Sequence, residues 1–181
     1  LLEKVIESAS KAPSGSNLQP WVFMVIDDAG TRKKIGGALN DFYEGGPLKD
    51  LIAQGQQVED KSQRLMMQGA QAFFSKLADS PAMIVPCLYQ LASPTPDPTS
   101  LEAGSSIYMA VQNLMLSARG LGLGTLMTTG HTLVNDTLRE ACAIPDDAYP
   151  VALIPIGYPD ANFGPTKRKG LDEILRWNTW S

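Results

Sequence analysis

The stretch that decides the fold is SSIYMAVQNLMLSARGLGLGT, residues 105–125. Between residues 105 and 121 the apolar side chains leave almost no polar face, which predicts a helix buried in a core or in a subunit interface. Gly120 and Gly122 end this helix, and residues 123–128 form a possible strand. Because the glycines follow a helix and do not link a strand to a helix N-terminus, we interpret them as helix caps, which disfavours a dinucleotide-binding fold.

Helices and strands are mixed along the rest of the chain. We predict helices up to about residue 12 and over 32–39, 61–77, 133–142 and 171–175, and strands over 21–26, 82–88 and 151–157. Thr31 is the expected cap of the second helix, and Pro155 indicates an edge or an irregularity in the last strand. Residues 40–60 carry only a weak helical signal, and residues 90–101 are a proline-rich loop. The pattern predicts one α+β or α/β domain over residues 1–181, with a single sheet and helices on its faces.

Composition excludes several classes of protein. With 15 Lys and Arg against 19 Asp and Glu, the 181-residue chain has a net charge of −4, so we expect no nucleic-acid partner. No apolar run is long enough to cross a membrane, so we expect no membrane partner. Two isolated cysteines, Cys87 and Cys142, fit a reducing cytoplasm. The chain begins inside a helical pattern without Met, and we expect a natural N-terminal segment to be missing.

Side chains for catalysis or metal binding are scarce. The single histidine, His131, has no neighbouring ligand set for zinc, and we interpret it as a polar loop residue. No serine lies in a GxSxG motif, and the adjacent carboxylates are expected to cap helices. The sequence therefore predicts no metal site and shows no local catalytic motif, although tertiary contacts could still bring distant groups together.

Two segments are candidates for ligand binding. Residues 13–20 supply hydroxyls, a carboxamide and backbone N–H groups that could wrap a polyhydroxylated chain or the polar edge of a ring, although an ordinary turn is equally possible. The cluster Lys167-Arg168-Lys169 could collect a phosphate, although the cluster alone favours a solvated face.

Four motifs in order resemble those of the FMN-dependent nitroreductase family. They are APSGSNLQPW at residues 12–21, AVQNLMLSARGLGLGT at 110–125, IPIGYP at 154–159 and KRKGLDEI at 167–174. The resemblance covers nearly the whole chain. It implies an α+β fold with a central, mostly antiparallel sheet flanked by helices, in an intertwined homodimer that binds FMN at the subunit interface. It also implies that the C-terminal segment, with Trp177 and Trp180, embraces the partner subunit.

The resemblance also implies roles for individual residues. Those matching the loop that contacts the flavin ring and ribityl chain are Pro13, Ser14, Gly15 and Asn17. A second set of residues matches the stretch near the reactive edge of the ring: Met127, Thr128, Thr129 and Gly130. Backbone N–H groups there could stabilise the reduced flavin. The phosphate-binding basic segment matches Lys167, Arg168 and Lys169.

The activity implied is an oxidoreductase in which FMN carries the chemistry. NADH or NADPH is the expected transient reductant, and a small electrophilic acceptor (a nitroaromatic, quinone or activated alkene) is reduced in a ping-pong sequence. The alternatives are the same fold and flavin with another reaction (dehalogenation, flavin fragmentation or dehydrogenation), or a flavin-binding protein without turnover. Two departures stand out: the family's Arg-Arg-Ser phosphate motif would lie upstream of Leu1, and some relatives have Glu where this chain has Thr129.

Overall fold

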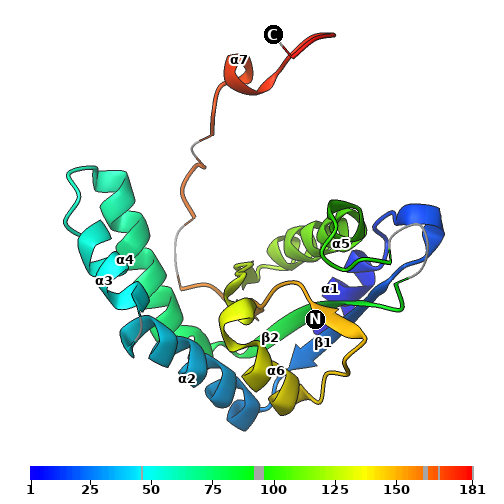
Figure 1. Ribbon diagram of the computed structural model, residues 1–181, viewed down its shortest axis with the longest axis horizontal. Coiled ribbons are helices and arrows are strands. Elements are labelled where there is room, and N and C mark those ends of the chain that lie inside the picture. Colours follow the sequence, from blue (N-terminus) through cyan, green and yellow to red (C-terminus); the bar gives the residue numbers. More distant parts are fainter. Residues whose placement is uncertain (46, 92–95, 161–162, 167, 181) are drawn as a thin grey trace.

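The computed structural model describes residues 1–45, 47–91, 96–160, 163–166 and 168–180, and Figure 1 shows their arrangement. The helices are α1 (Leu2–Ala9), α2 (Ala29–Gly45), α3 (Pro47–Gly55), α4 (Lys61–Lys76), α5 (Leu101–Gly120), α6 (Asn135–Cys142) and α7 (Leu171–Ile174). Short 3-10 turns are η1 (Gly15–Asn17), η2 (Leu77–Asp79) and η3 (Gly130–Val134). The strands are β1 (Trp21–Ile26), β2 (Ala82–Tyr89), β3 (Gly124–Thr125), β4 (Ala148–Pro150) and β5 (Ile154–Gly157).

The strands form one sheet in the order β1-β2-β5-β3, with β4 added beside β2. Every strand pairing is antiparallel, which confirms an α+β fold. β3 pairs with β5 through Thr125 and Ile156, and the same register resumes at a bridge between Thr128 and Leu153. Pro155 lies in the gap between these two contacts. Because proline has no N–H to donate to the ladder, the gap is the irregularity that Pro155 predicts.

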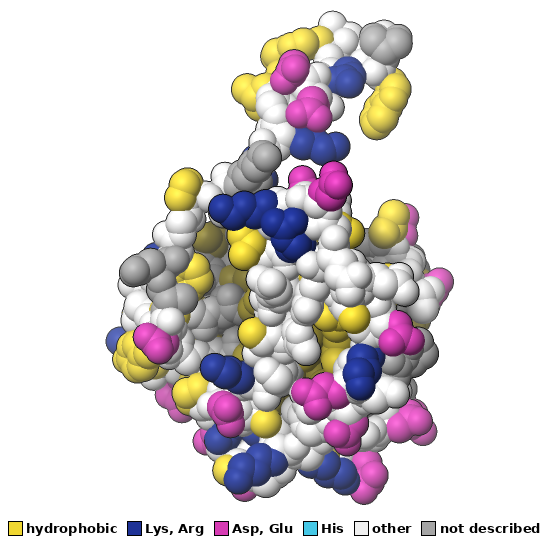
Figure 2. Space-filling model, turned by 90° about the vertical axis from the view of Figure 1, so that its left-hand side faces the viewer, with side chains coloured by type: hydrophobic (Ala, Val, Ile, Leu, Met, Phe, Trp, Pro, Cys, Tyr) yellow, Lys and Arg dark blue, Asp and Glu magenta, His cyan; other side chains and the backbone are white. Residues whose placement is uncertain are grey.

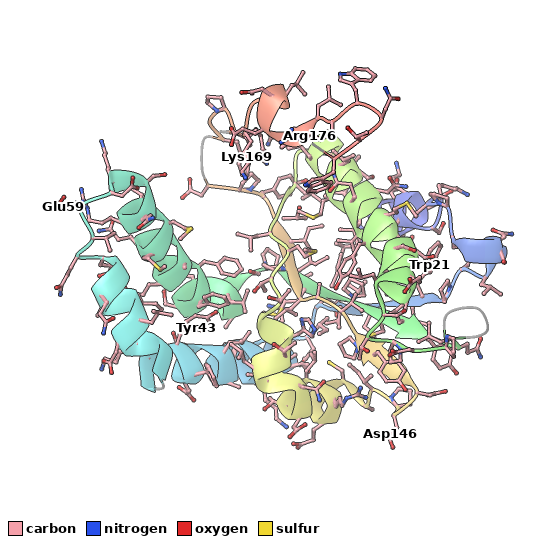
Figure 3. The ribbon with its side chains drawn as sticks, turned by 45° about the horizontal axis from the view of Figure 1, so that its top comes forward. Trp21, Tyr43, Glu59, Asp146, Lys169 and Arg176 are labelled. Atoms are coloured by element: carbon pink, nitrogen blue, oxygen red, sulfur yellow. The ribbon has the colours of Figure 1, made fainter. Side chains whose placement is uncertain are left out.

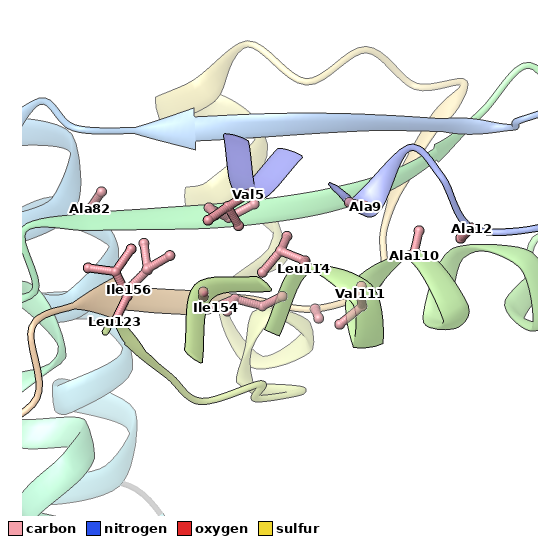
Figure 4. Close-up of a cluster of buried hydrophobic side chains, with 13 residues drawn as sticks. Val5, Ala9, Ala12, Ala82, Ala110, Val111, Leu114, Leu123, Ile154 and Ile156 are labelled. Atoms are coloured by element: carbon pink, nitrogen blue, oxygen red, sulfur yellow. The ribbon is translucent and has the colours of Figure 1, made fainter. Parts of the chain in front are cut away.

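The central strand β2 is covered on both faces. Ala82 and Ile84 belong to a core cluster with α1, α5 and β5, shown in Figure 4. Met83 and Val85 belong to a second cluster, built with α2, α4 and α6. Successive side chains of a strand point to opposite faces, so the sheet is the middle layer between two layers of helices.

α5 ends as the glycine pattern predicts. Gly122 adopts a left-handed backbone conformation, with φ of 82°. Its N–H donates to the carbonyl of Arg119 at 3.1 Å, and the N–H of Leu123 donates to the carbonyl of Ala118 at 2.9 Å. This pair of bonds is a Schellman motif, which satisfies the last helical carbonyls and turns the chain directly into β3.

Two predicted helix ends were wrong, and two apolar segments are more exposed than their composition suggests. α1 ends at Ala9 and does not reach residue 12. β1 is an edge strand with exposed valines and is not buried. α2 begins at Ala29 because Asp28 caps it, accepting from the N–H of Thr31 at 2.7 Å. On α4 the buried side chain is that of Phe74, whereas Leu65 and Met66 are exposed.

Two parts project from this layered body. α3 and α4 form a helical arm at the left, and the C-terminal segment with α7 stands clear of the body at the top of the picture (Figure 1). Figure 2 shows hydrophobic side chains gathered at the tip of this tail, and the exposed residues there are Leu171, Ile174, Leu175, Trp177 and Trp180. Side chains of this kind are usually buried, so the tip of the tail is an exposed apolar surface.

Candidate functional site

The loop of residues 13–19 has a fixed and unusual backbone. Ser16, Asn17 and Gln19 all have positive φ, between 49° and 55°. Such conformations cost on the order of 1 kcal/mol or more for each residue that is not glycine, so surrounding bonds must hold them. Within the loop, the hydroxyl of Ser14 accepts from the N–H of Gln19 at 3.0 Å.

The same loop is bonded to α5. The N–H of Gly15 donates to the hydroxyl of Ser106 at 3.2 Å. The N–H groups of Asn17 and Leu18 close turns onto the carbonyls of Ser14 and Gly15. These N–H groups are therefore used inside the protein, and what the loop presents to a ligand is mainly side chains and carbonyl oxygens.

A second site element is the open edge of the sheet after β3. Thr128 exchanges two hydrogen bonds with Leu153, at 3.0 and 2.9 Å. Residues on either side of such a pair direct their N–H groups away from the partner strand, so those of Met127 and Thr129 point to the free edge. Neither N–H makes a hydrogen bond within the described chain. Two backbone donors at an open edge fit a ligand with ring nitrogen and carbonyl acceptors, such as a flavin.

Gly130 is placed differently from its neighbours. Its N–H donates to the hydroxyl of Thr128 at 3.0 Å. It is buried, and a Cβ here would lie 3.2 Å from Leu39 and 3.4 Å from the ring of Phe74. Close packing beneath the sheet edge therefore explains why residue 130 is a glycine.

A cleft runs between this edge and α5. It has a volume of 520 Å³ and is lined by Tyr108, Val111, Gln112, Met115, Thr125, Leu126 and Met127. Its α5 wall continues into exposed apolar side chains, with Met109 partly and Leu116 60% exposed. The helix predicted as apolar all round thus buries one side in this chain and leaves the other open.

His131 is buried, and its interpretation as a polar loop residue was wrong. It is only 6% exposed and follows directly on the edge segment, in η3. Burial lowers its pKa below the ordinary value of 6.5, and this effect is partly offset by the carbonyls of Thr128 and Pro150. The imidazole is therefore neutral at physiological pH.

The predicted basic segment lies on the tail. Lys167 falls outside the described residues, while Arg168 and Lys169 are exposed. In Figure 3, Lys169 lies on the tail, apart from Trp21, which follows the loop of residues 13–19. The loop of residues 13–19 and the basic part of the tail are thus separate places in one chain.

Other candidate chemistry is weak. Among the described residues no group of His, Cys, Asp and Glu is placed so that it could hold a metal ion. Burial raises the pKa of the Cys87 thiol to about 11 and also raises that of Cys142, which keeps both protonated. No helix within the described residues is long and apolar enough to span a membrane.

Comparison with known proteins identifies the family. The model of the nitroreductase family matches residues 1–158. The chain belongs to the nitroreductase family. Among curated relatives of this nitroreductase-family chain, an NADH dehydrogenase of Thermus thermophilus is 26% identical, covering 98% of this chain and 84% of the relative. Iodotyrosine deiodinase 1 of Mus musculus is also 26% identical and covers 97% of this chain, which spans only 60% of that relative's length.

Solved structures show the same fold. The FMN and NADPH-dependent nitroreductase NfnB from Sphigopyxis superposes with a TM-score of 0.71 at 20% identity, covering 99% of this chain and 89% of that one. Oxidized iodotyrosine deiodinase bound to FMN and 3-iodo-L-tyrosine superposes with a TM-score of 0.66 at 21% identity, covering 99% and 87%. At these identities the likeness establishes the fold and not the reaction.

The sequence does not reveal the structural roles of two residues on α5. Ser106 anchors the loop of residues 13–19, and Gly104 makes room for the ring of Tyr108 on the next turn of α5. The signal available was a polar or small residue inside an otherwise apolar helix, but the partner of Ser106 is remote in sequence.

Proposed function

We propose that this nitroreductase-family chain is an FMN-dependent oxidoreductase that reduces a small electrophilic acceptor at the expense of NADH or NADPH. The observation that carries the proposal is the pair of N–H groups of Met127 and Thr129, which donate to no described residue, at an open sheet edge beside the cleft on α5. When bound, FMN supplies the two-electron chemistry, accepting hydride from NAD(P)H and delivering electrons to the acceptor in ping-pong order.

The residues of the chain bind and orient the cofactor. The N–H groups of Met127 and Thr129 hold the polar edge of the ring, and Thr128 and Gly130 fix the backbone that presents them. Pro13, Ser14, Gly15 and Asn17 contact the ring and ribityl chain, and the basic residues Lys167, Arg168 and Lys169 bind the phosphate. No side chain is required to form a covalent bond.

The site is completed by a second copy of the chain in a homodimer. The loop of residues 13–19 and the basic part of the tail are separate within one chain, the outer face of α5 exposes apolar side chains, and the tail ends in exposed tryptophans. Pairing two α5 helices covers their apolar faces and brings the loop of one subunit to the sheet edge of the other. A cytoplasmic location completes the proposal, supported by the free thiols Cys87 and Cys142.

A second reaction has one observation in its favour. The iodotyrosine deiodinases among the relatives match almost the whole of this chain, so reductive dehalogenation on the same flavin is the alternative.

Anaerobic titration of the purified protein tests both readings. We expect flavin absorbance that bleaches with NADH or NADPH and returns on addition of a nitroaromatic or quinone, but not of a halogenated phenol. Protein that gains no flavin absorbance with added FMN contradicts the proposal. Flavin that neither nicotinamide reduces favours a binding protein, and recolouring by the halophenol alone favours the dehalogenase.

A further inference from the structure

A second cavity lies beside the sheet edge, at the first two turns of α5. Its volume is 480 Å³, within the usual range of small-molecule sites. Its walls are largely apolar, formed by Leu88, Leu101, Tyr108 and Val151, with Thr129 and His131 among its polar lining. No described lining residue is Lys, Arg, Asp or Glu.

His131 is the polar group that makes this cavity unusual. The side chain lines the cavity and is 94% buried. The carbonyls of Thr128 and Pro150 act on the ring, but its Nδ1 atom makes no hydrogen bond of normal geometry with a described residue. Leaving a buried polar atom unpaired costs about 1–3 kcal/mol. A natural chain tolerates such a cost where the group has a partner that is not part of the chain.

The opposite wall is fixed in place. The hydroxyl of Tyr108 donates to the carbonyl of Val151 at 3.4 Å. The ring lies over Gly104, where an added Cβ would stand 3.1 and 3.3 Å from two ring carbons. Because residue 104 has no side chain, the ring of Tyr108 can occupy this position and the space next to it stays open.

We propose that this cavity receives the electron acceptor of the oxidoreductase, and that the acceptor is an uncharged, ring-sized molecule with a hydrogen-bonding group that meets His131. The inference rests on the proposed function because Thr129 belongs both to the cavity and to the edge that we assign to the flavin. A carboxylate or ammonium group buried here would have no described charge to pair with, which costs several kcal/mol.

Another cavity shows the contrast. The space between α2, α3 and α4, of 270 Å³, is lined by Glu44, Lys49 and three side-chain amides. It is a charged cavity, and none of the residues that we assign to the flavin lines it. It supplies a matched control for the variants below.

Two probes of equal ring size test the charge selectivity. The FMN-loaded protein is assayed with 4-nitrobenzyl alcohol, which is neutral, and with 4-nitrobenzoate, which is anionic. We expect kcat/KM to favour the neutral probe by about tenfold or more. Equal values, or a preference for the anion, would overturn the inference.

A spectroscopic readout locates the probe without relying on turnover. His131 is the only histidine of the chain, so its ring resonances are identified without assignment of the whole protein. We expect 4-nitrobenzyl alcohol, added to the oxidised holoprotein without nicotinamide, to shift these resonances, and 4-nitrobenzoate to leave them unchanged. Unshifted resonances at saturating neutral probe would contradict the assignment of the cavity.

Variants separate this inference from the proposed function. His131→Leu is expected to raise KM for the neutral probe about tenfold, His131→Gln to restore part of it, and Gly104→Ala to raise KM by displacing the ring of Tyr108. Gln56→Ala, in the charged cavity, is the control. If FMN absorbance and reduction by nicotinamide are intact but these KM values do not move, the cavity inference alone fails. If neither FMN binding nor reduction is seen, the proposed function fails, while the same NMR titration on the protein without FMN still decides whether the cavity binds the neutral probe.

Discussion

The amide of Gly15 donates a hydrogen bond of 3.2 Å to the hydroxyl of Ser106, across 91 residues of sequence. Ser106 is 6% exposed, and its hydroxyl is a polar group in the otherwise apolar buried face of α5. The bond attaches a loop with three residues of positive φ to the longest helix of the fold. The loop is therefore positioned by α5 and not only by its own turns.

Replacing Ser106 by Ala tests this attachment. The change removes the acceptor of the Gly15 N–H while keeping the helix, and we expect the free energy of unfolding to fall by about 1 kcal/mol. We also expect a several-fold weaker affinity for FMN, measured by equilibrium dialysis. The control is Ser105→Ala, because the hydroxyl of Ser105 donates to the carbonyl of Glu102 in the same helix. Equal FMN affinities in the two variants would contradict a positioning role for Ser106.

Two neighbouring glycines of α2 are predicted to respond to alanine substitution with opposite changes in stability. A Cβ at Gly36 would lie 2.7 Å from Cβ, 2.8 Å from N and 2.9 Å from Cα of Ala78 in η2. At Gly37 nothing lies within 4 Å. Alanine is the better helix former by about 1 kcal/mol, so Gly37→Ala should stabilise the protein by up to that amount. Gly36→Ala should instead destabilise the protein by about 1–3 kcal/mol, because the backbone at Ala78 would have to move to make room for the methyl group.

Urea unfolding of the two variants beside the parent protein measures this difference. The pair shares one helix and one substitution, so helix propensity cancels between them. A Gly36→Ala protein as stable as the Gly37→Ala protein would mean that α2 and η2 are not packed as described.

The proposed homodimer predicts a charge-sensitive face on α5. Leu116 is 60% exposed on the side of the helix away from the core. A glutamate there would have to be desolvated in a subunit interface, so Leu116→Glu should shift the protein from dimer to monomer in light scattering. Leu65 on α4 is similarly exposed, at 57%, and Leu65→Glu should leave the assembly unchanged. A parent protein that is already a monomer would refute the dimer itself.

The parts of the fold that could be predicted are those with a local physical signal. The strand over Trp21–Ile26 and the end of α5 at its glycines follow from periodicity and from the left-handed turn at Gly122. The start of α2 could not be fixed because Asp28 and Thr31 are both good caps, and only the 2.7 Å bond between them decides.

The parts that could not be predicted depend on distant contacts. The end of α2 and the whole of α3 have a mostly polar sequence, so their apolar periodicity is faint. The stacking of Tyr43 on Phe74, with ring centroids 3.8 Å apart, joins α2 to α4 (Figure 3 shows Tyr43 between them). The burial of His131 likewise arises from strands and helices remote from it in sequence, which no local pattern shows.

The basic tail gives a prediction about cofactor retention. Lys169 is exposed on the tail (Figure 3), so its charge contributes little to the stability of its own chain. Lys169→Ala should weaken FMN binding several-fold and reduce its dependence on salt, because one ammonium–phosphate contact is lost. Lys33→Ala, an exposed lysine of α2, removes the same charge elsewhere and serves as control. If both variants lose FMN equally, the effect is one of net charge and not of a phosphate site.

The buried histidine predicts how stability changes with pH. Burial lowers the pKa of His131 below 6.5 in the folded chain, so between that lowered value and 6.5 the unfolded chain binds more protons than the folded one. The contribution is fully present above pH 6.5 and is lost as the pH falls toward the folded pKa. We therefore expect the free energy of unfolding of the parent protein to decline between pH 7 and pH 5, measured by urea titration at each pH.

His131→Gln isolates this contribution because no other histidine titrates in that range. The carboxylates of Asp28, Asp97 and Glu140 have pKa values lowered by their hydrogen bonds, so the stability that they contribute is lost only at more acidic pH. The variant should consequently show a flatter dependence between pH 7 and pH 5 than the parent. Parallel curves would show that the imidazole is solvated in the native protein, and they would remove the buried neutral side chain on which the acceptor cavity depends.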